Sequence, residues 1–432
     1  MPASYPPIFP LLLAPVYARF GLNYVALKFV PELMFVLAAI ALYVLGRLRG
    51  LAPLPAVLPA GALGLSGIVL GIKDAVLSDS TYLFFGGLAL VALVYIYQKR
   101  WDESRPGRAA AAASGLMLLA YGTRAIGLSL ITAFILYEAC LKRRLRRFNI
   151  FVLAAFAVGV LLILRIYDTR SYANQFVVAP MAYLHNAVLY VRAPAALWAG
   201  SPAFLRYALF AITLIIFTAT WIRHLLTRPS IVEFYAITVV LPLILYSAGH
   251  SDRYLMPLFP IYLLYFVEGV VDLQNRLLPK TRWAVLAAGL LLAMGAVANV
   301  IGMQKGAYQE GVEQPSFRQV SDFLQRSDKS GVVVSWNPRV LALYTDQPSA
   351  WYPFVPQDEV FDEYLNRVHA RYILVYLRNE DDRQWLLPHI EHQRDLFPSV
   401  FHNRDFVVYT VDGYVIDHAQ EKRPDSVRPA HE

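Results

Sequence analysis

The sequence has one cysteine, few charged residues and none of the common nucleotide or zinc motifs. Cys140 is the only cysteine in 432 residues, which excludes an intrachain disulfide and a cysteine-rich metal site. Charged side chains make up 16% of the chain, where a soluble domain carries roughly 25%. Walker, GxSxG, HExxH, CxxC and dinucleotide patterns are missing, so nucleotide-driven transport and metalloprotease chemistry have no support. The start, MPASYPPIFP, lacks the basic region and cleavage site of a secretory signal peptide.

Hydrophobic residues are abundant instead, at 57% of the chain, and they form long apolar runs. Roughly ten such runs precede residue 304, and runs of this kind need lipid as their solvent. They are predicted to span a membrane near 24–46, 53–72, 81–98, 109–122, 125–141, 148–167, 203–223, 231–249, 254–274 and 283–303. A shorter stretch, 8–20, ends at Gly21 and is too short to span, which favours a helix lying in the membrane interface.

Basic residues gather in alternate loops, and this asymmetry predicts the orientation of the spans. The richer loops contain Arg47, Arg49, Lys99, Arg100, Arg105, Arg108, the run 142–147, Arg223, Arg228, Arg276, Lys280 and Arg282. The opposite loops hold mostly single cations, namely Arg19, Lys73, Arg124, Arg170, Arg192 and Arg253. Cytoplasmic loops carry the excess of Lys and Arg, so the N-terminus and the tail after residue 304 are predicted to lie outside a plasma (inner) membrane.

Two further expectations follow from the charges. An outward N-terminus before the first span needs explaining, and we expect a further span upstream of Met1. The net charge of +8 arises from the clusters at the ends of spans, so it indicates membrane orientation and not nucleic-acid binding.

The tail differs in character from the rest of the chain. It is polar, with β-type runs at 331–335, 372–376 and 406–410 and helical periodicity at 315–327 and 357–368. The sequence therefore predicts an α-helical polytopic membrane protein with a small C-terminal extracytoplasmic α/β domain. The expected divisions are an outer interfacial segment at 1–22, a transmembrane domain at 23–303, the α/β domain at 304–420 and a disordered tail at 421–432.

Ionisable residues at the outer rim of the spans are the candidates for chemistry, because charge near lipid is costly. Lys73, Asp74 and Asp79 lie where the second span ends and the third begins. Their carboxylates suit a sugar hydroxyl, a metal or a proton, whereas a plain interfacial ion pair explains Lys73 and Asp74 equally well. Arg124 separates two short apolar segments, and its fork of N–H donors suits a phosphate, a carboxylate or a structural ion pair.

A third candidate group is His250, Arg253 and Tyr254, at the outer mouth between the eighth and ninth spans. Arg253 suits a lipid-linked phosphate at headgroup level. His250 with Asp252 suits a general base, although two residues do not make a metal site, and a solvated turn is the alternative. The loop 168–202 mixes aromatic and amide side chains, which suits carbohydrate recognition and an interfacial aromatic belt alike.

Several segments together resemble a family of membrane enzymes. YPPIFPLLLAPVYARFGLNYVALKFV, LSDSTYLFF, GTRAIGLSLITAFILYEACLKRR, HSDRYLMPLFPIYLL and SWNPRVLALYTDQPSAWYP match in order and spacing. They resemble the polytopic glycosyltransferases with the GT-C fold, most nearly the bacterial members of glycosyltransferase family 39, which are related to protein mannosyltransferases and aminoarabinose transferases. The resemblance implies transfer of a sugar from a polyprenyl-phosphate donor at the periplasmic face, with inversion at the anomeric carbon.

The resemblance also assigns roles. It implies Asp79 as a site acid that contacts sugar or acceptor, Arg253 as the ligand of the donor phosphate and Arg124 as a second ligand or a cavity-lining residue. Pro6 and Pro7 would set the interfacial helix that roofs the donor groove. The family's main general base is an acidic residue in a first outer loop, which is expected upstream of Met1. The alternative explanation for the missing acidic residue is a shortened form of the enzyme that lacks this base.

Two other functions compete with the transferase. One is a non-catalytic protein that binds lipid-linked sugars, and the other is a flippase-like transporter, which predicts buried charges along a continuous path. Besides the polyprenyl-phosphate donor, the expected partners are membrane lipid and an acceptor that is a glycan, a lipid or a protein. No cofactor is assigned, and a divalent metal is left open.

Overall fold

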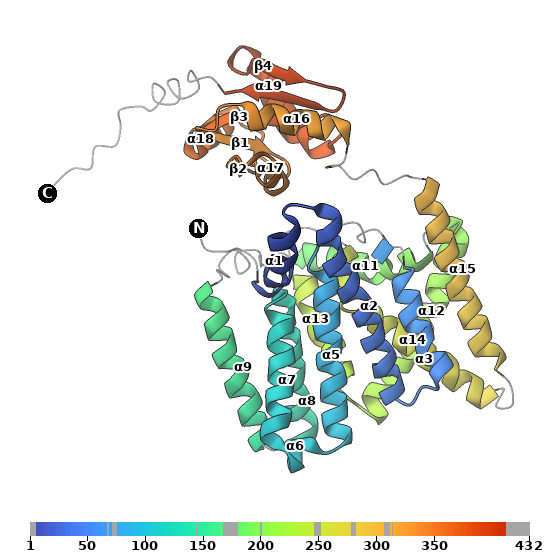
Figure 1. Ribbon diagram of the computed structural model, residues 1–432. Helices are drawn as coiled ribbons and strands as arrows, with labels where there is room; N and C mark the ends of the chain where they lie inside the picture. Colours follow the sequence, from blue (N-terminus) through green and yellow to red (C-terminus); the bar gives the residue numbers. More distant parts are fainter. Residues whose placement is uncertain are drawn as a thin grey trace. The chain divides into compact units, whose positions relative to one another are not determined.

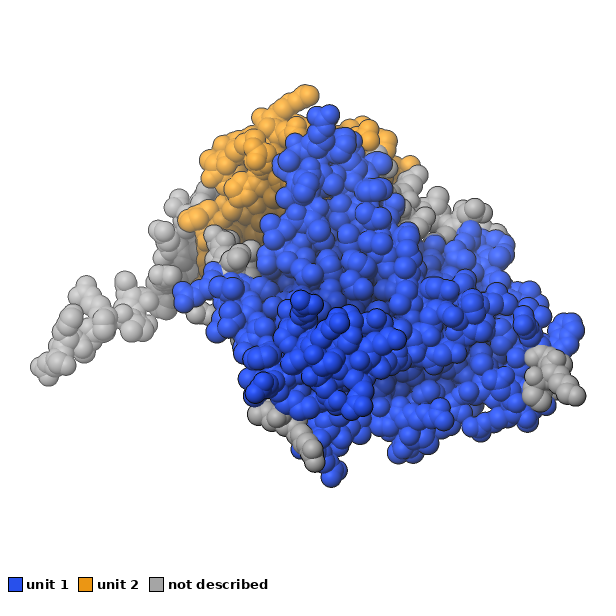
Figure 2. Space-filling view, turned by 60° about the horizontal axis from the view of Figure 1, so that its bottom comes forward, with its two compact units in different colours: residues 1–307 blue, residues 308–432 orange. Residues whose placement is uncertain are grey.

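The chain folds into two compact units, residues 1–307 (unit 1) and 308–432 (unit 2), which are coloured separately in Figure 2. The structure is a computed structural model. It describes residues 6–66, 69–70, 76–143, 146–166, 180–198, 201–245, 252–277, 282–305, 312 and 314–411.

Unit 1 is helical throughout its described residues (Figure 1). The helices before residue 143 are α1 (Ile8–Phe20), α2 (Tyr24–Leu48), α3 (Pro53–Gly64), α5 (Asp79–Gln98), α6 (Trp101–Ser104), α7 (Pro106–Tyr121), η1 (Ala125–Gly127), α8 (Leu128–Tyr137) and η2 (Glu138–Lys142). Those that follow are α9 (Arg147–Ile166), α11 (Pro180–Arg192), η3 (Ala193–Trp198), α12 (Ala203–Thr227), α13 (Ile231–Leu245), η4 (Asp252–Leu255), α14 (Phe259–Leu277) and α15 (Trp283–Lys305).

Six stretches of described helix are long and apolar enough to cross a membrane, and they coincide with six of the predicted spans. They are Tyr24–Leu48, Asp79–Gln98, Ala125–Lys142, Arg147–Arg165, Ala203–Thr227 and Trp283–Ile301. The spans predicted at 53–72, 109–122 and 231–249 correspond to described helices of only 12, 16 and 15 residues. The span predicted at 254–274 falls on α14, which carries Glu268, Asp272 and Arg276. For these four the crossing remains a prediction.

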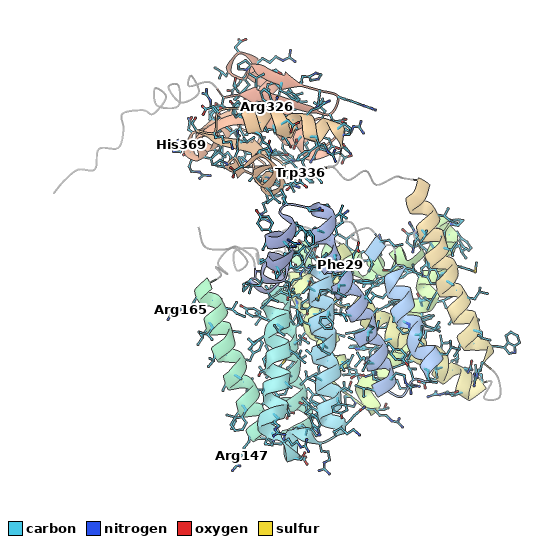
Figure 3. The ribbon with its side chains drawn as sticks, viewed as in Figure 1. Phe29, Arg147, Arg165, Arg326, Trp336 and His369 are labelled. Atoms are coloured by element: carbon cyan, nitrogen blue, oxygen red, sulfur yellow. The ribbon has the colours of Figure 1, made fainter. Side chains whose placement is uncertain are left out.

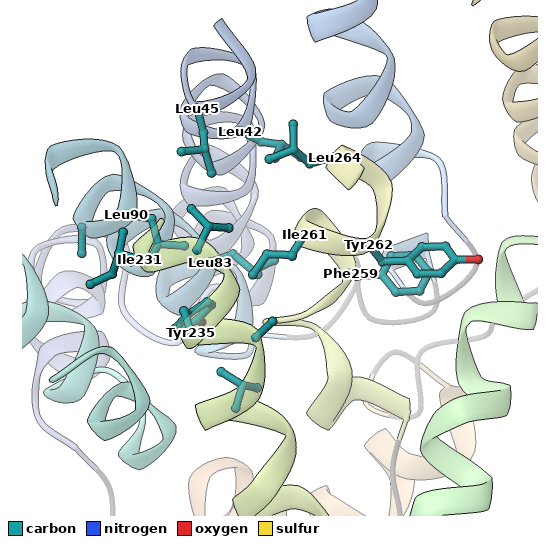
Figure 4. Packing of buried hydrophobic residues seen from close by; sticks show 14 of the residues in the cluster. Leu42, Leu45, Leu83, Leu90, Ile231, Tyr235, Phe259, Ile261, Tyr262 and Leu264 are labelled. Atoms are coloured by element: carbon teal, nitrogen blue, oxygen red, sulfur yellow. The ribbon is translucent and has the colours of Figure 1, made fainter. Parts of the chain in front are cut away.

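The helices of unit 1 bury one continuous apolar core while leaving apolar side chains on the outside. α5 packs against α2 and α7, α7 against α9, α8 against α13, and α14 against α3, α12 and α15. Figure 4 shows part of the core, in which Leu42, Leu83 and Ile261 are buried. Leu161, Ile215 and Leu290 are each more than 60% exposed. This distribution fits a lipid solvent, because water would disfavour such a surface.

Unit 2 is a three-layer α/β fold around one five-stranded sheet. Its strands are β1 (Val332–Ser335), β2 (Ser349–Ala350), β3 (Ala370–Tyr376), β4 (Ser399–His402) and β5 (Phe406–Thr410), in the order β2-β1-β3-β5-β4. Strands β2, β1 and β3 are parallel, and β5 and β4 continue the sheet in antiparallel fashion.

Helices cover both faces of this sheet. Val334 on β1 packs with residues of α18 (Asp358–Val368) and α19 (Leu387–His392), whereas its neighbour Val333 packs with α16 (Pro315–Arg326) and α17 (Pro338–Thr345). Successive side chains of a strand point to opposite faces, so a run of valines serves both cores. The polytopic helical fold with a small C-terminal α/β domain is thereby confirmed.

Candidate functional site

The site centres on a break between α7 and α8. α7 ends at Tyr121, and the Thr123 hydroxyl donates to the Leu119 carbonyl at 2.7 Å. Arg124 then adopts an extended backbone, with φ −150° and ψ 141°, before the short η1 helix begins. At Gly127 an added Cβ would lie 2.5 Å from the backbone of Tyr121, so only glycine allows the chain to fold back this closely. The break therefore projects Arg124 sideways from two apolar helices.

Arg124 forms an ion pair with Asp79, the first residue of α5. Asp79 is 1% exposed, while the Arg124 side chain keeps 18% of its surface exposed. A carboxylate in the first turn of a helix is stabilised by the unpaired backbone N–H groups there, and the guanidinium completes its neutralisation. The pair thus joins two of the sequence candidates into one local unit that has access to solvent through the arginine.

The N-terminal helix α1 packs on the same break. The Ile8 backbone N–H donates to the Gly122 carbonyl at 2.8 Å, and a Cβ at Gly122 would lie 2.6 Å from the Ile8 side chain. Pro7 caps α1, where a missing N–H costs nothing. Leu11 and Phe20 are 62% and 59% exposed, as expected of a helix lying against lipid. The Pro-Pro start of α1 and the Arg124 break are therefore neighbours.

A small apolar cavity begins one helical turn further along α5. It holds about 30 Å³, room for roughly two water molecules, and is lined by residues of α2, α3, α5 and α13 and by Pro257, Pro260 and Ile261. Leu42, Leu45, Leu83 and Leu90 contribute to its wall and are drawn in Figure 4. Its polar atoms include the hydroxyls of Tyr82 and Tyr235, which bond to each other at 2.9 Å.

The remaining sequence candidates are not brought into this unit by described contacts. Lys73, Asp74 and His250 lie outside the described residues. Arg253 belongs to η4 by its backbone, but its side chain also lies outside what the structure describes. Tyr254 is half-buried and packs against the core of unit 1. Their roles remain predictions.

Sequence reasoning missed a larger buried charge network at another place in unit 1. Arg49, which caps α2, donates to both carboxylate oxygens of Glu268 at 2.6 and 3.0 Å and to Glu233 at 3.3 Å. Its exposed fraction is 7%, as is that of Glu268, and Glu233 is fully buried. The Ser230 hydroxyl, His224 and the ring of Tyr265 complete its surroundings. The sequence feature that could have revealed this network is the presence of these two glutamates inside predicted apolar spans.

A second network connects the ends of α6 and η2 to α9. Arg146 donates to Glu138 at 2.9 and 3.0 Å and pairs with Asp102. Glu138 also accepts from Asn149 at 3.0 Å and from Tyr97 at 2.7 Å. Such buried networks fix helices against one another, and both contain basic residues from the loops predicted to be cytoplasmic.

A metal site does not emerge from the described residues. Nowhere among them do three or more His, Cys, Asp or Glu side chains gather as ligands would.

Comparisons with known proteins establish the fold. No family model and no curated protein matches the chain. Among solved structures, the oligosaccharyltransferase AglB of Archaeoglobus fulgidus, in complex with an inhibitory peptide and a dolichol-phosphate, is similar with a TM-score of 0.56, 12% identity and coverage of 98% of this chain and 67% of that one. This chain thus spans about two thirds of its length. The same enzyme has been solved with zinc and sulfate.

Two further structures agree. ArnT from Cupriavidus metallidurans, bound to undecaprenyl phosphate, gives a TM-score of 0.52 with 14% identity, covering 95% of this chain and 88% of that one. The arabinofuranosyltransferase AftD from Mycobacteria gives a TM-score of 0.52 with 14% identity, covering 90% of this chain and 34% of that one. At this identity the likeness concerns the fold, so the chain is an integral membrane protein with the GT-C fold.

Proposed function

We propose that this protein is a glycosyltransferase that moves a sugar from a polyprenyl-phosphate donor to an acceptor at the periplasmic face of the inner membrane. The observation that carries the proposal is the Asp79–Arg124 pair at the helix break, in a chain with the GT-C fold. ArnT and AglB, which share the fold, have been solved with undecaprenyl phosphate and dolichol-phosphate. Membership of glycosyltransferase family 39 is part of the proposal.

In the proposed reaction an acceptor hydroxyl attacks the anomeric carbon, the bond from that carbon to the phosphate oxygen breaks, and the hydroxyl proton passes to a general base. Negative charge grows on the departing polyprenyl phosphate, so cations beside it lower the barrier. We assign this role to Arg253 and, through its exposed fraction, to Arg124. A guanidinium can hold two phosphate oxygens through two parallel N–H groups, whereas a lysine presents a point charge without that fork.

Asp79 then acts by way of Arg124. The carboxylate is almost fully buried against the guanidinium, so it fixes the direction of the fork. The direct contact with sugar or acceptor that the resemblance implies would require Asp79 to leave this pair. α1, packed on Gly122, supports the proposed role of the Pro6-Pro7 segment as a roof beside the donor.

The test is a transfer assay with the full chain in lipid nanodiscs and a radiolabelled polyprenyl-phosphate sugar. Arg253→Ala and Arg124→Ala are compared with Arg192→Ala, which removes an exposed cation predicted to lie on the same side. We expect both site variants to lose roughly tenfold or more in transfer and in donor affinity, because each loses a charge-assisted contact. Unchanged donor affinity in Arg253→Ala would refute its assignment.

The same assay separates the competing functions. A binding protein would retain affinity for the donor and show no transfer with any acceptor, whereas a flippase would move the donor across liposomes. The Arg49 and Arg146 networks and the Asp79–Arg124 pair are separated by the apolar core, which argues against a continuous polar path among the described residues. Transfer that survives treatment with EDTA would exclude an essential divalent metal.

A further inference from the structure

The parallel half of the unit 2 sheet ends in a surface that the transfer reaction does not use. Val334 of β1 pairs with Ala350 of β2, and Ser335 of β1 pairs with Leu374 of β3, so the three strands end at one edge. The chain leaves β1 through α17 to β2 and returns through α18 to β3 on the other side of β1. The crevice beyond such a switch point is where open α/β sheets bind ligands.

Aromatic side chains follow directly after two of these strands. Trp336 comes after β1 and is 37% exposed, and Trp351 and Phe354 come after β2 and are 49% and 47% exposed. The ring of Phe354 lies 6.2 Å from that of Trp351 and 5.9 Å from that of Trp385. Trp336, labelled in Figure 3, lies two residues before α17 begins. We call Trp336, Trp351, Phe354 and Trp385 the aromatic edge.

The loop that carries Trp351 and Phe354 is anchored by a buried carboxylate. Asp382 is fully buried and accepts the Tyr352 hydroxyl at 2.6 Å and the Tyr376 backbone N–H at 2.7 Å. Tyr352 therefore points inward, and its chain neighbours Trp351 and Phe354 are left at the surface. A surface of exposed rings fixed by a buried hydrogen-bond network is preorganised, so a ligand loses little entropy in the protein on binding.

Hydrogen-bonding groups border the rings. Trp336 donates its indole N–H to Asp381 at 3.3 Å, and the Asp381 backbone N–H donates to the Asn379 side chain at 2.7 Å. Asn337, next to Trp336, and Glu380, next to Asp381, are exposed. The border thus offers amides and carboxylates within reach of the rings, and the exposed Arg339, Arg378 and Arg383 adjoin them in sequence. It therefore carries charges of both signs, which favours a ligand without net charge.

From this combination we infer that the aromatic edge of unit 2 binds a neutral oligosaccharide. One face of a pyranose ring is made of C–H groups and packs on an aromatic ring, while its hydroxyls project sideways to amides and carboxylates. Phe354 meets Trp351 and Trp385 edge to face, at interplanar angles of 79° and 60°. A sugar ring therefore packs on the exposed face of one ring, while the polar neighbours bond its hydroxyls. The inference does not depend on transfer, because binding needs no reaction.

The experiment measures binding of hexose tetrasaccharides (gluco-, manno- and galacto-configured, one at a time) to the full chain in nanodiscs, by saturation-transfer NMR and calorimetry. We expect at least one of them to bind, and Trp351→Ala and Phe354→Ala each to weaken it by about tenfold. Trp351→Phe, which keeps a ring, should restore most of the affinity. Both truncated side chains are about half exposed, so the fold should persist, and thermal unfolding checks this.

Two controls make the result specific. Val400→Ala removes an exposed apolar side chain from β4, the opposite edge of the sheet, and Trp283→Ala removes an exposed tryptophan from unit 1. Both should bind the saccharide normally. The inference is overturned if none of the tetrasaccharides binds, if the aromatic-edge variants bind as well as the controls, or if those variants lose affinity for anionic phospholipid vesicles and not for saccharide.

Discussion

The two units bury carboxylates in different ways. In unit 1, Glu233 and Glu268 surround Arg49, so the buried negative charges have a permanent cation between them. In unit 2, Asp382 is equally buried, but its oxygens accept from neutral donors, the Tyr352 hydroxyl and the Tyr376 N–H. Burial raises the pKa of Asp382 to about 6, even though these hydrogen bonds act in the opposite direction.

The contrast shows what each arrangement can do. A buried carboxylate that bonds to an arginine has its charge compensated, so removing either partner leaves an uncompensated charge. A carboxylate held by neutral donors changes protonation within reach of ordinary pH. The Asp79–Arg124 pair lies between these cases, because its acid is buried while its arginine stays partly exposed. Of the three, it is the one arranged for a charged ligand to approach the cation.

The largest effect is expected from breaking the Arg49 network. Arg49→Ala leaves two buried glutamates facing each other and should destabilise unit 1 by about 3–5 kcal/mol, measured by thermal or denaturant unfolding in detergent. The matched control is Arg100→Ala, which breaks an exposed pair with Glu103, whose side chains are 77% and 50% exposed. That change should cost less than about 1 kcal/mol. Equal losses in the two variants would refute the distinction between buried and exposed pairs.

The pH dependence of unit 2 tests the other half of the comparison. The folded pKa of Asp382, about 6, exceeds its ordinary value of 3.8, so the folded state binds more protons between these pH values. Stability should therefore fall as pH rises from about 4 to 6, by up to about 3 kcal/mol, and then level off. The change can be measured as the amide hydrogen-exchange protection of β3, residues 370–376, in the full chain. Asp382→Asn should remove that slope, and a slope that persists in the variant would assign it to other groups.

The intermediate case, the Asp79–Arg124 pair, is tested through the backbone that holds it. Gly127→Ala would place a Cβ within 2.5 Å of the Tyr121 backbone, so η1 must move and carry Arg124 away from Asp79. We expect a loss of about 1–3 kcal/mol in stability, together with reduced transfer. Gly61→Ala, where an added Cβ meets nothing within 4 Å, is the control inside a helix. A Gly127 variant with unchanged stability and transfer would show that the close approach is not needed.

Sequence patterns anticipated much of the fold and part of the site. Long apolar runs identified six helices of spanning length, and short runs of β-branched and aromatic residues located β1, β3 and β5 within two residues. β2 was missed because it has only two residues, and β4 because its side chains are mostly exposed and give no apolar run. Asp79 and Arg124 were each predicted as functional because charges near lipid are costly. Their pairing was not predicted, because the two residues are 45 positions apart in sequence and only the fold brings them together. The Arg49 network was missed because its members come from four helices, and only packing brings them together.

The smallest expected effect concerns one hydroxyl beneath Asp382. Tyr352→Phe removes the 2.6 Å hydrogen bond to the carboxylate and little packing, so the loss near pH 7 should be about 0.5–1.5 kcal/mol. Because that bond favours the ionised acid, its removal should also move the midpoint of the pH transition upward from about 6. The double variant Tyr352→Phe/Asp382→Asn separates the hydrogen bond from the packing. If the two side chains are coupled, the double variant should lose less stability than the sum of the two single variants. Additive losses of stability and an unchanged midpoint would mean that the Tyr352 hydroxyl does not stabilise the ionised Asp382 carboxylate. The difference between the two units would then depend on burial alone.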